Sequence, residues 1–468
     1  MNARFTVAAA LSALVFVCCT SAARSQDATG LRVAVDASQA PQKIFHVVVT
    51  MPARAGPMTV VYPRWIPGWH GPVGPIADVV NLRLKAAGNA LEWRRDLVDF
   101  FAVRTTVPNG VSTLEADFDV VGAAATTGEM DVPSTENLAL IQWSSFLMYP
   151  EGAVADSLPA TASLTLPAGW DFGTALPVRS RQGAAISFDT VSLTTLVDSP
   201  LNMGRYFSKI RLDDRSELDV AADSAAALAA PPALVTGMKH LVAEGPAAYG
   251  GTRHFRTYHF LLTLSETIAA NGIEHHESSD NRAGEKYIAD PQVFRPFADL
   301  MPHEFSHSWN GKYRRPASLL VDDFQKPERT DLLWVYEGMN QYVGEVLTTR
   351  SRLTSLQDQL DGLAMAAARM DFENGRAWRP IRDVADTAPL LYNAPGAYTS
   401  LRRNAFDFYT EGNLIRLDAD VTIRKISNGR KSLDDFWALW AAGGSTTPSV
   451  AANSDDAVSH MHGTVSPN

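Results

Sequence analysis

The chain has 468 residues, of which 46% are hydrophobic and 20% charged, and its formal net charge is −10. This length and apolar content allow a large core and two or three domains. No lysine- or arginine-rich run interrupts the acidic balance, so neither a nucleic-acid partner nor an anionic membrane surface is expected.

Residues 1–23 have the pattern of a secretory signal peptide. Arg4 lies in a short positive region, residues 7–17 are uncharged and mostly apolar, and Ser21, Ala22 and Ala23 offer small residues for cleavage. The apolar stretch is too short to span a bilayer comfortably, and no later segment is apolar for long enough. Both cysteines lie inside this segment. We therefore expect a periplasmic or secreted protein without disulfides or stable membrane insertion.

Residues 27–220 are predicted to form an N-terminal β-rich domain. Short alternating runs broken by Gly, Pro, Asn and Asp are typical of strands joined by turns. The prolines and glycines of residues 63–71 are predicted to shape a loop around Trp65 and Trp69. The clearest predicted strands are residues 31–35, 44–49, 58–62, 114–120, 162–166 and 187–191.

Residues 221–442 are predicted to form a mainly α-helical domain, because the apolar spacing becomes helical from Phe294 onward. The predicted fold class is therefore α+β. The tail, residues 443–468, has too little apolar content to fold alone and is predicted to be disordered. The predicted helices are residues 303–311, 328–350, 354–370, 408–426 and 432–441.

The most informative motif is His-Glu-x-x-His at residues 303–307. On a helix, His303 and His307 lie one turn apart on the same face, so both imidazoles can reach one metal ion. Glu304 lies beside them and could take a proton from a water at the metal. The alternative is a structural helix with two partly buried histidines. Pro302 leaves two further possibilities, a helix that starts near it or one that is kinked there.

A second glutamate, Glu337, follows His307 by 30 positions within a predicted helix. A glutamate on a buried helix face is costly unless it is paired or bound to a metal. The alternative is an exposed glutamate on a surface helix. Two histidines plus a glutamate leave a fourth position open, which is typical of catalytic zinc. The sequence therefore predicts one Zn²⁺ bound by His303, His307 and Glu337, and the activity of a zinc peptidase.

Two other segments offer candidate site residues. Glu274 follows an apolar strand, and its carboxylate could pair with a cationic group. The alternative for the neighbouring cluster, residues 275–277, is a solvated loop. Tyr409 begins another predicted helix, where its hydroxyl could stabilise an oxyanion or, alternatively, pack in the core.

These residues resemble the glycyl aminopeptidase family of zinc metallopeptidases. Around the site, the likeness lies in residues 303–310, 312, 315–316 and 333–338, including the spacing to Glu337. Outside it, the likeness lies in W-I-P-G at 65–68, D-S-P at 198–200, G-I-E-H at 272–275 and S-L-D-D at 432–435. The similarity runs from about residue 30 to residue 440.

The resemblance implies a β domain, a thermolysin-like helical catalytic domain and usually a C-terminal PDZ domain. It also implies zinc-dependent release of N-terminal residues, often glycine or other small residues, from peptide substrates. By motif position the functional residues would be the zinc ligands His303, His307 and Glu337, the general base Glu304, the amino-terminus-binding Glu274 with Gly272, and the transition-state-stabilising Tyr409.

Three departures distinguish this chain from the family pattern. Asn271 stands where a glycine usually precedes Gly272, and Glu411 stands where a lysine is common after the tyrosine. The chain also ends where further helices and the PDZ domain would follow, which predicts a truncated or divergent member. A zinc endopeptidase, or an inactive peptide-binding protein, remains an alternative. The sequence does not indicate the oligomeric state.

Overall fold

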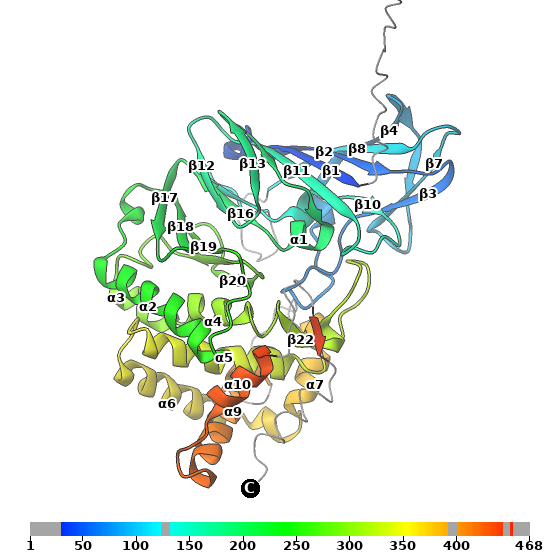
Figure 1. The fold of residues 1–468 in the computed structure, drawn as a ribbon. Coiled ribbons are helices and arrows are strands. Elements are labelled where there is room, and N and C mark those ends of the chain that lie inside the picture. The colour runs from blue at the N-terminus through cyan, green and yellow to red at the C-terminus, as the bar shows by residue number, and fades with distance from the viewer. Residues whose placement is uncertain (1–29, 123–131, 392–400, 402, 443–449, 453–468) are drawn as a thin grey trace, which may run out of the picture.

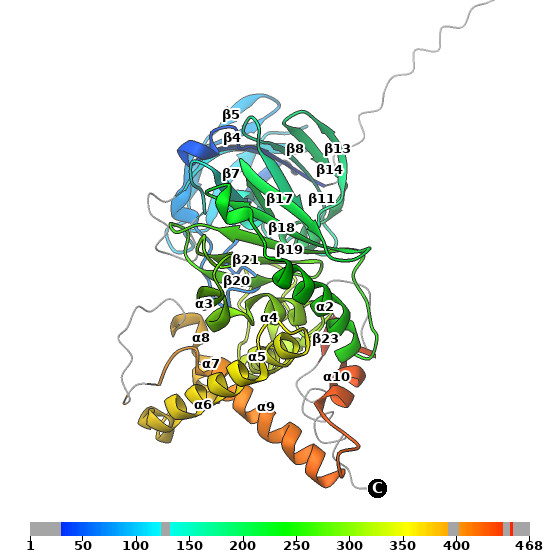
Figure 2. The same ribbon diagram turned by 90° about the vertical axis from the view of Figure 1, so that its left-hand side faces the viewer.

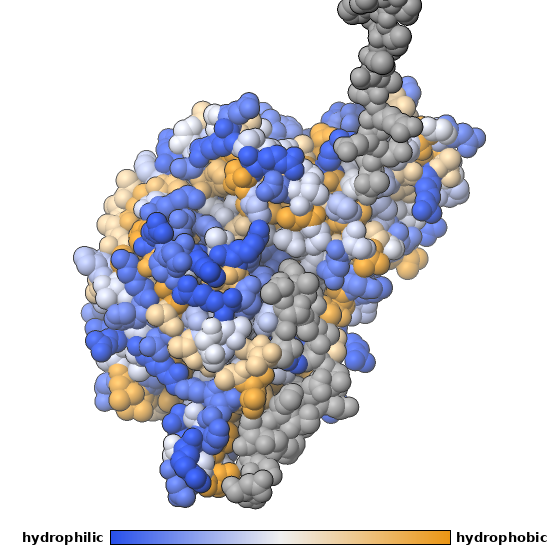
Figure 3. Space-filling view, in the orientation of Figure 1, coloured by the Kyte–Doolittle hydropathy of each residue, from blue (hydrophilic) through white to orange (hydrophobic). Residues whose placement is uncertain are grey.

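The computed structural model describes residues 30–122, 132–391, 401, 403–442 and 450–452. The predicted signal peptide lies outside these residues. The predicted disordered tail also lies outside them, except for Val450–Ala452, which form strand β23. In the described part of the chain, no helix is both long and apolar enough to cross a membrane. The face drawn in Figure 3 mixes hydrophilic and hydrophobic residues, and its hydrophobic patches are small and scattered.

The N-terminal region is built on a nine-stranded sheet of mostly antiparallel strands. Along β2, Phe45, Val47, Val49 and Met51 are buried in alternation with less buried residues, so one face of the strand supplies the core. The predicted strand at 187–191 is divided between β14 and β15. The sheet contains β1 (Leu31–Asp36), β2 (Ile44–Pro52), β4 (Val79–Ala86), β5 (Asn89–Leu91), β8 (Thr113–Val121), β11 (Pro159–Thr165), β13 (Val178–Gln182), β14 (Ala185–Phe188) and β15 (Val191–Ser192).

Two smaller sheets complete this region. One joins strands in the order β10-β3-β7-β6, and the other in the order β12-β16-β9. Their strands are β3 (Gly56–Val61), β6 (Trp93–Arg95), β7 (Ala102–Val107), β9 (Leu138–Ile141), β10 (Tyr149–Pro150), β12 (Asp171–Thr174) and β16 (Leu201–Gly204).

A five-stranded sheet lies between the N-terminal sheets and the helices (Figure 1). The predicted domain boundary at residues 220/221 falls inside its strand β18. β20 forms one edge of the sheet, antiparallel to β21, and contacts helix α4. The strands, in spatial order, are β17 (Tyr206–Arg211), β18 (Ser216–Ala222), β19 (Tyr258–Leu264), β21 (Ser278–Ala283) and β20 (Asn271–Glu274).

The helices lie on the far side of this sheet (Figure 2), and the α+β prediction is confirmed. Small residues let three of them approach closely. A Cβ on Gly338 would lie 2.6 Å from the Cα of Gly412, and one on Gly344 would lie 2.9 Å from the Cα of His303. The main helices are α2 (Pro232–Ala248), α4 (Leu300–His307), α5 (Leu333–Arg350), α6 (Leu356–Phe372), α9 (Asp407–Ile426) and α10 (Leu433–Ala442).

Candidate active site

Helix α4 carries the His-Glu-x-x-His motif and begins two residues before Pro302. Proline is tolerated in the first turn because an N–H there has no partner within the helix. The backbone N–H of His303 donates to the carbonyl of Asp299 over 2.8 Å, so helical bonding starts directly after the proline. Of the two possibilities, the helix that starts near Pro302 is therefore correct.

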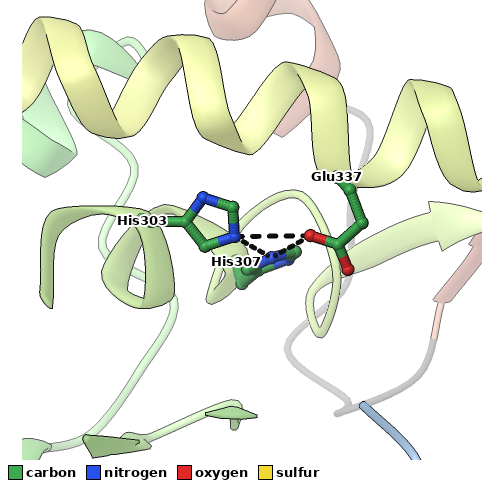
Figure 4. Close-up of side chains that lie close together, drawn as sticks. All are labelled: His303, His307 and Glu337. Carbon is green, nitrogen blue, oxygen red and sulfur yellow. Dashed lines mark hydrogen bonds and ion pairs between the residues drawn. The ribbon is translucent and has the colours of Figure 1, made fainter. Parts of the chain in front are cut away.

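The three predicted metal ligands meet at one point, although they come from two helices (Figure 4). The Nε2 atoms of His303 and His307 lie 3.0 Å apart, and Glu337 Oε2 lies 3.3 Å and 3.1 Å from them. Ligands at about 2.0–2.1 Å from a tetrahedral zinc are separated by about 3.3 Å. All three side chains are buried. The ligand atoms therefore have the spacing that a tetrahedral zinc ion requires.

Hydrogen bonds orient His307 toward this point. Its Nδ1 lies 3.2 Å from the carbonyl oxygen of Asn310, to which a protonated Nδ1 donates. Asn340 Nδ2 lies 2.6 Å from the same carbonyl and also 2.6 Å from His307 Nδ1, and Ser306 Oγ donates to Asn340 Oδ1 over 2.9 Å. A proton on Nδ1 leaves the Nε2 lone pair free for a metal ion.

His70 also belongs to the site, and sequence analysis missed it. Its Nε2 lies 2.7 Å from Glu337 Oε1, across a sequence separation of 267 residues. His70 has a left-handed φ of 50° and lies in the loop that was predicted around Trp65 and Trp69. The W-I-P-G element next to it was the only available signal.

The electrostatics favour a positive charge at the centre. Burial by itself would lower the pKa of His303, but contact with Glu337 and the nearby Glu304 raise it to about 9. Burial would raise the pKa of Glu337, yet His307, His303 and His70 hold it well below its usual range. A buried carboxylate that stays ionised beside imidazoles is suited to binding a cation.

Glu304 lies beside the three predicted metal ligands, and one of its carboxylate oxygens has no hydrogen-bond partner in the described residues. This oxygen, Oε2, is buried. Burial and the carboxylates of Glu274 and Glu337 raise its pKa well above the usual value, against the opposing effect of His303. Strand β20 approaches so closely that a Cβ on Gly272 would lie 2.2 Å from Glu304 Oε1. These properties suit a carboxylate that exchanges protons.

Glu274 ends the edge strand and reaches the same centre. One potential ligand atom from each of Glu274, Glu304 and His307 lies within 4.8 Å of the other two. The hydroxyl of Tyr336 donates to Glu274 Oε1 over 2.6 Å. Burial opposes ionisation, but His307, Lys312 and His70 lower the pKa of Glu274 to about 2. Glu274 is therefore an anion inside the site.

The solvated-loop alternative is wrong for His275 and His276, both of which are buried. Asp198, from the D-S-P turn, holds this segment in place. Its carboxylate lies 3.3 Å from His275 Nδ1 and 3.1 Å from the buried Lys312 Nζ, and it accepts the backbone N–H of His276 over 2.8 Å. This ion cluster therefore holds the segment that directly follows β20.

Tyr409, in the first turn of α9, faces the site. Its ring centroid lies 5.8 Å from that of His303. It lines a cavity of about 20 Å³ together with Glu274, Glu304 and all three ligands. It also lines an adjoining cleft of about 400 Å³, which shares Gly272 and Glu304 with the cavity.

Glu411, which stands where the family commonly has a lysine, has its negative charge near Tyr409 balanced by arginines. Glu411 pairs with Arg403, and its Oε1 lies 3.4 Å from Arg376 Nη2. Asn271, the other departure inside the described residues, lines both the cavity and the cleft.

The match of the β-rich and helical regions to peptidase family models defines the class of the protein as a peptidase. Residues 296–415 match the M61 glycyl aminopeptidase family, and residues 32–205 match the Peptidase M61 N-terminal domain. The chain belongs to this family. Its site has histidine and glutamate groups that could hold a metal ion.

The fold is similar to that of an aminopeptidase N family protein from Idiomarina loihiensis. The two share 19% sequence identity with a TM-score of 0.76, over 92% of this chain and 72% of the other. No curated protein matches the sequence.

Proposed function

We propose that the protein is a zinc-dependent aminopeptidase that releases small N-terminal residues from peptides. One observation carries this proposal: the buried, ionised Glu274 lies beside Glu304 and His307 at the end of the edge strand. An anion there can hold the ammonium group of a peptide N-terminus by a charge-assisted hydrogen bond. The scissile bond then lies next to the general base.

The proposed mechanism assigns one role to each side chain. His303, His307 and Glu337 would hold the zinc ion, which supplies Lewis-acid polarisation of the carbonyl and of water. Glu304 accepts a proton from the attacking water and passes it to the leaving amine, a role that its place beside the predicted ligands and its unpartnered Oε2 support. The hydroxyl of Tyr409 donates to the oxyanion of the tetrahedral intermediate.

The shape of the site supports the preference for glycine and other small residues. The cavity beside Glu274 measures only about 20 Å³ and is also lined by the three predicted zinc ligands, so little space remains beside Glu274 for a side chain once a metal ion is bound. Trp69 and Gly68 line it, and a Cβ on Gly68 would already lie 2.9 Å from Glu274 Oε2. The rest of the peptide would occupy the adjoining cleft of about 400 Å³.

The test compares glycyl peptides that have a free N-terminus with N-acetylated versions of the same peptides. Acetylation leaves Glu274 facing a neutral amide, an unpaired buried charge that costs several kcal/mol. We expect single residues to be released only from the peptides with a free N-terminus. Glu274→Ala should raise KM for these peptides and reduce the difference in cleavage rate between free and acetylated peptides. Internal cleavage of acetylated peptides at the same rate would favour the endopeptidase.

The variant Glu304→Gln distinguishes the hypothesis of an active peptidase from that of an inactive peptide-binding protein. Because Glu304 is not a ligand, this variant should keep its zinc, measured by elemental analysis, and lose several orders of magnitude in kcat. If the wild-type protein carries zinc and binds glycyl peptides but never hydrolyses them, the inactive alternative is correct.

Export to the periplasm or the exterior is proposed from the N-terminal sequence alone. N-terminal sequencing of the mature protein tests it, and we expect a start near residue 24.

A further inference from the structure

A second pocket lies behind the active site, where α5, α9 and α10 meet the end of β22 (Arg314–Pro316). Its volume is about 20 Å³, and most of its lining is apolar. The lining residues are Asn310, Pro316, Val335, Met339, Arg416, Ala419, Leu433, Phe436, Trp437 and Trp440.

Arg416 brings an uncompensated charge into this pocket. Its side chain is only 2% exposed, and neither Nη1 nor Nη2 has a hydrogen-bond partner in the described part of the chain. The guanidinium carbon lies 4.8 Å from the ring centroid of Trp334, which satisfies one face but none of the N–H donors. Burial lowers the pKa of Arg416 to about 10, so the group stays charged at neutral pH.

Of the two acidic residues that follow Arg416 on α9, Asp418 is exposed and the buried Asp420 is already engaged. Asp420, one turn further along α9, accepts the hydroxyl of Tyr342 over 3.0 Å and Arg424 Nε over 2.8 Å. Its other oxygen accepts the backbone N–H of Leu433 over 2.7 Å. Among the residues that the structure describes, no ion pair therefore balances the charge of Arg416.

Two further donors are buried around the same pocket without a partner. The Nε1 atoms of Trp437 and Trp440 are buried and make no hydrogen bond in the described residues. A second cation stands over Trp440, with the guanidinium carbon of Arg314 4.8 Å from its ring centroid. Buried polar groups are normally hydrogen-bonded, so a pocket that collects donors and positive charge without an acceptor points to an anion.

We propose that this pocket binds a chloride ion. A volume of about 20 Å³ holds one water-sized group, which admits a monatomic anion and is too small for phosphate or a free carboxylic acid. Arg416, Trp437 and Trp440 all line this space, so their unpartnered N–H groups are the donors available to a chloride ion there. Its negative charge would offset the cost of the buried cation.

The pocket also contacts the frame of the active site. Asn310 lines it and, through its carbonyl, accepts from His307 Nδ1. Val335 and Met339 line it from α5, two residues to either side of Glu337. Chloride would thus stabilise the elements that position the metal ligands.

Thermal unfolding tests the proposal on the purified full chain. At constant ionic strength, replacing gluconate by 200 mM chloride should raise the Tm of the wild-type protein by about 3 °C or more. Arg416→Met keeps the length of the side chain without its charge and should abolish this response. Arg430→Met, at an exposed position after α9, is the matched control and should respond like the wild type. Equal Tm values for the wild type in the two salts would overturn the proposal.

Crystals of the wild-type protein grown in bromide give an independent measurement. An anomalous peak within hydrogen-bonding distance of the Arg416 guanidinium is the expected result, and it decides the matter even if Arg416→Met does not fold. No peak there, or density for a carboxylate from a peptide or another chain, would show that chloride is not the ligand. Trp440→Phe, which removes one donor and keeps the ring, should weaken halide binding several-fold.

Discussion

Gly272→Ala would show whether catalysis depends on the close approach of β20 to Glu304. The added Cβ would lie 2.2 Å from Glu304 Oε1 and 2.8 Å from its Cδ, whereas ordinary carbon contacts are about 3.5–4.0 Å. The carboxylate must therefore move by roughly 1 Å, because the backbone of Gly272 is held in a strand. A misplacement of about 1 Å can cost on the order of 10²-fold in rate.

The assay is kcat on a glycyl arylamide, measured alongside zinc content and Tm. We expect kcat to fall by about 10²-fold while zinc content stays unchanged, since the atoms nearest to the added Cβ belong to Glu304 and Leu300. Gly362→Ala is the control, because nothing lies within 4 Å of its added Cβ. A Gly272→Ala enzyme with kcat within about twofold of wild type would refute the reasoning.

Three further predictions address the metal, the oxyanion and the pH dependence. Glu337→Ala should lower zinc affinity as well as rate, and stoichiometric zinc at unchanged affinity would place the third ligand elsewhere. Tyr409→Phe should lower kcat by about 10²–10³-fold with little change in KM, whereas a structural tyrosine would show lower Tm and near-normal turnover. Burial raises the pKa of Glu345 from 4.5 to about 7, so the folded state binds this proton more tightly, and stability falls as pH rises between these values. Relative to wild type, Glu345→Gln should gain roughly 2–3 kcal/mol in free energy of unfolding between pH 5 and pH 8, measured by urea unfolding. A difference from wild type that is the same at both pH values would contradict this.

Local patterns predicted the elements well where one face of the element is buried. The run at 44–49 became β2 because its alternation matches the two-residue period of a strand. The helical spacing at 408–426 became α9 almost to the residue. The strand at 187–191 was wrong in part, since the chain leaves β14 after Phe188 and pairs again only at Val191.

Some residues of the candidate site were predicted from local spacing, and others only from the resemblance to a family. His303 and His307 share a helix face by virtue of their spacing alone, and Glu337 lies on a helix whose pattern is equally local. Glu274 and Tyr409 were placed by resemblance, and the structure brings both to the cavity that contains the ligands.

By itself, the sequence determined the motif, its ligand atoms and the alternation of strands and helices, because these follow from the residue types and from periods of a few residues. Only the tertiary structure brought His70 to Glu337, clustered Asp198 with Lys312, and buried the Nη atoms of Arg416 without a hydrogen-bond partner among the described residues. Such contacts join segments far apart in the chain. They depend on how loops and helices pack against one another, and packing leaves no period in the sequence from which it could be predicted.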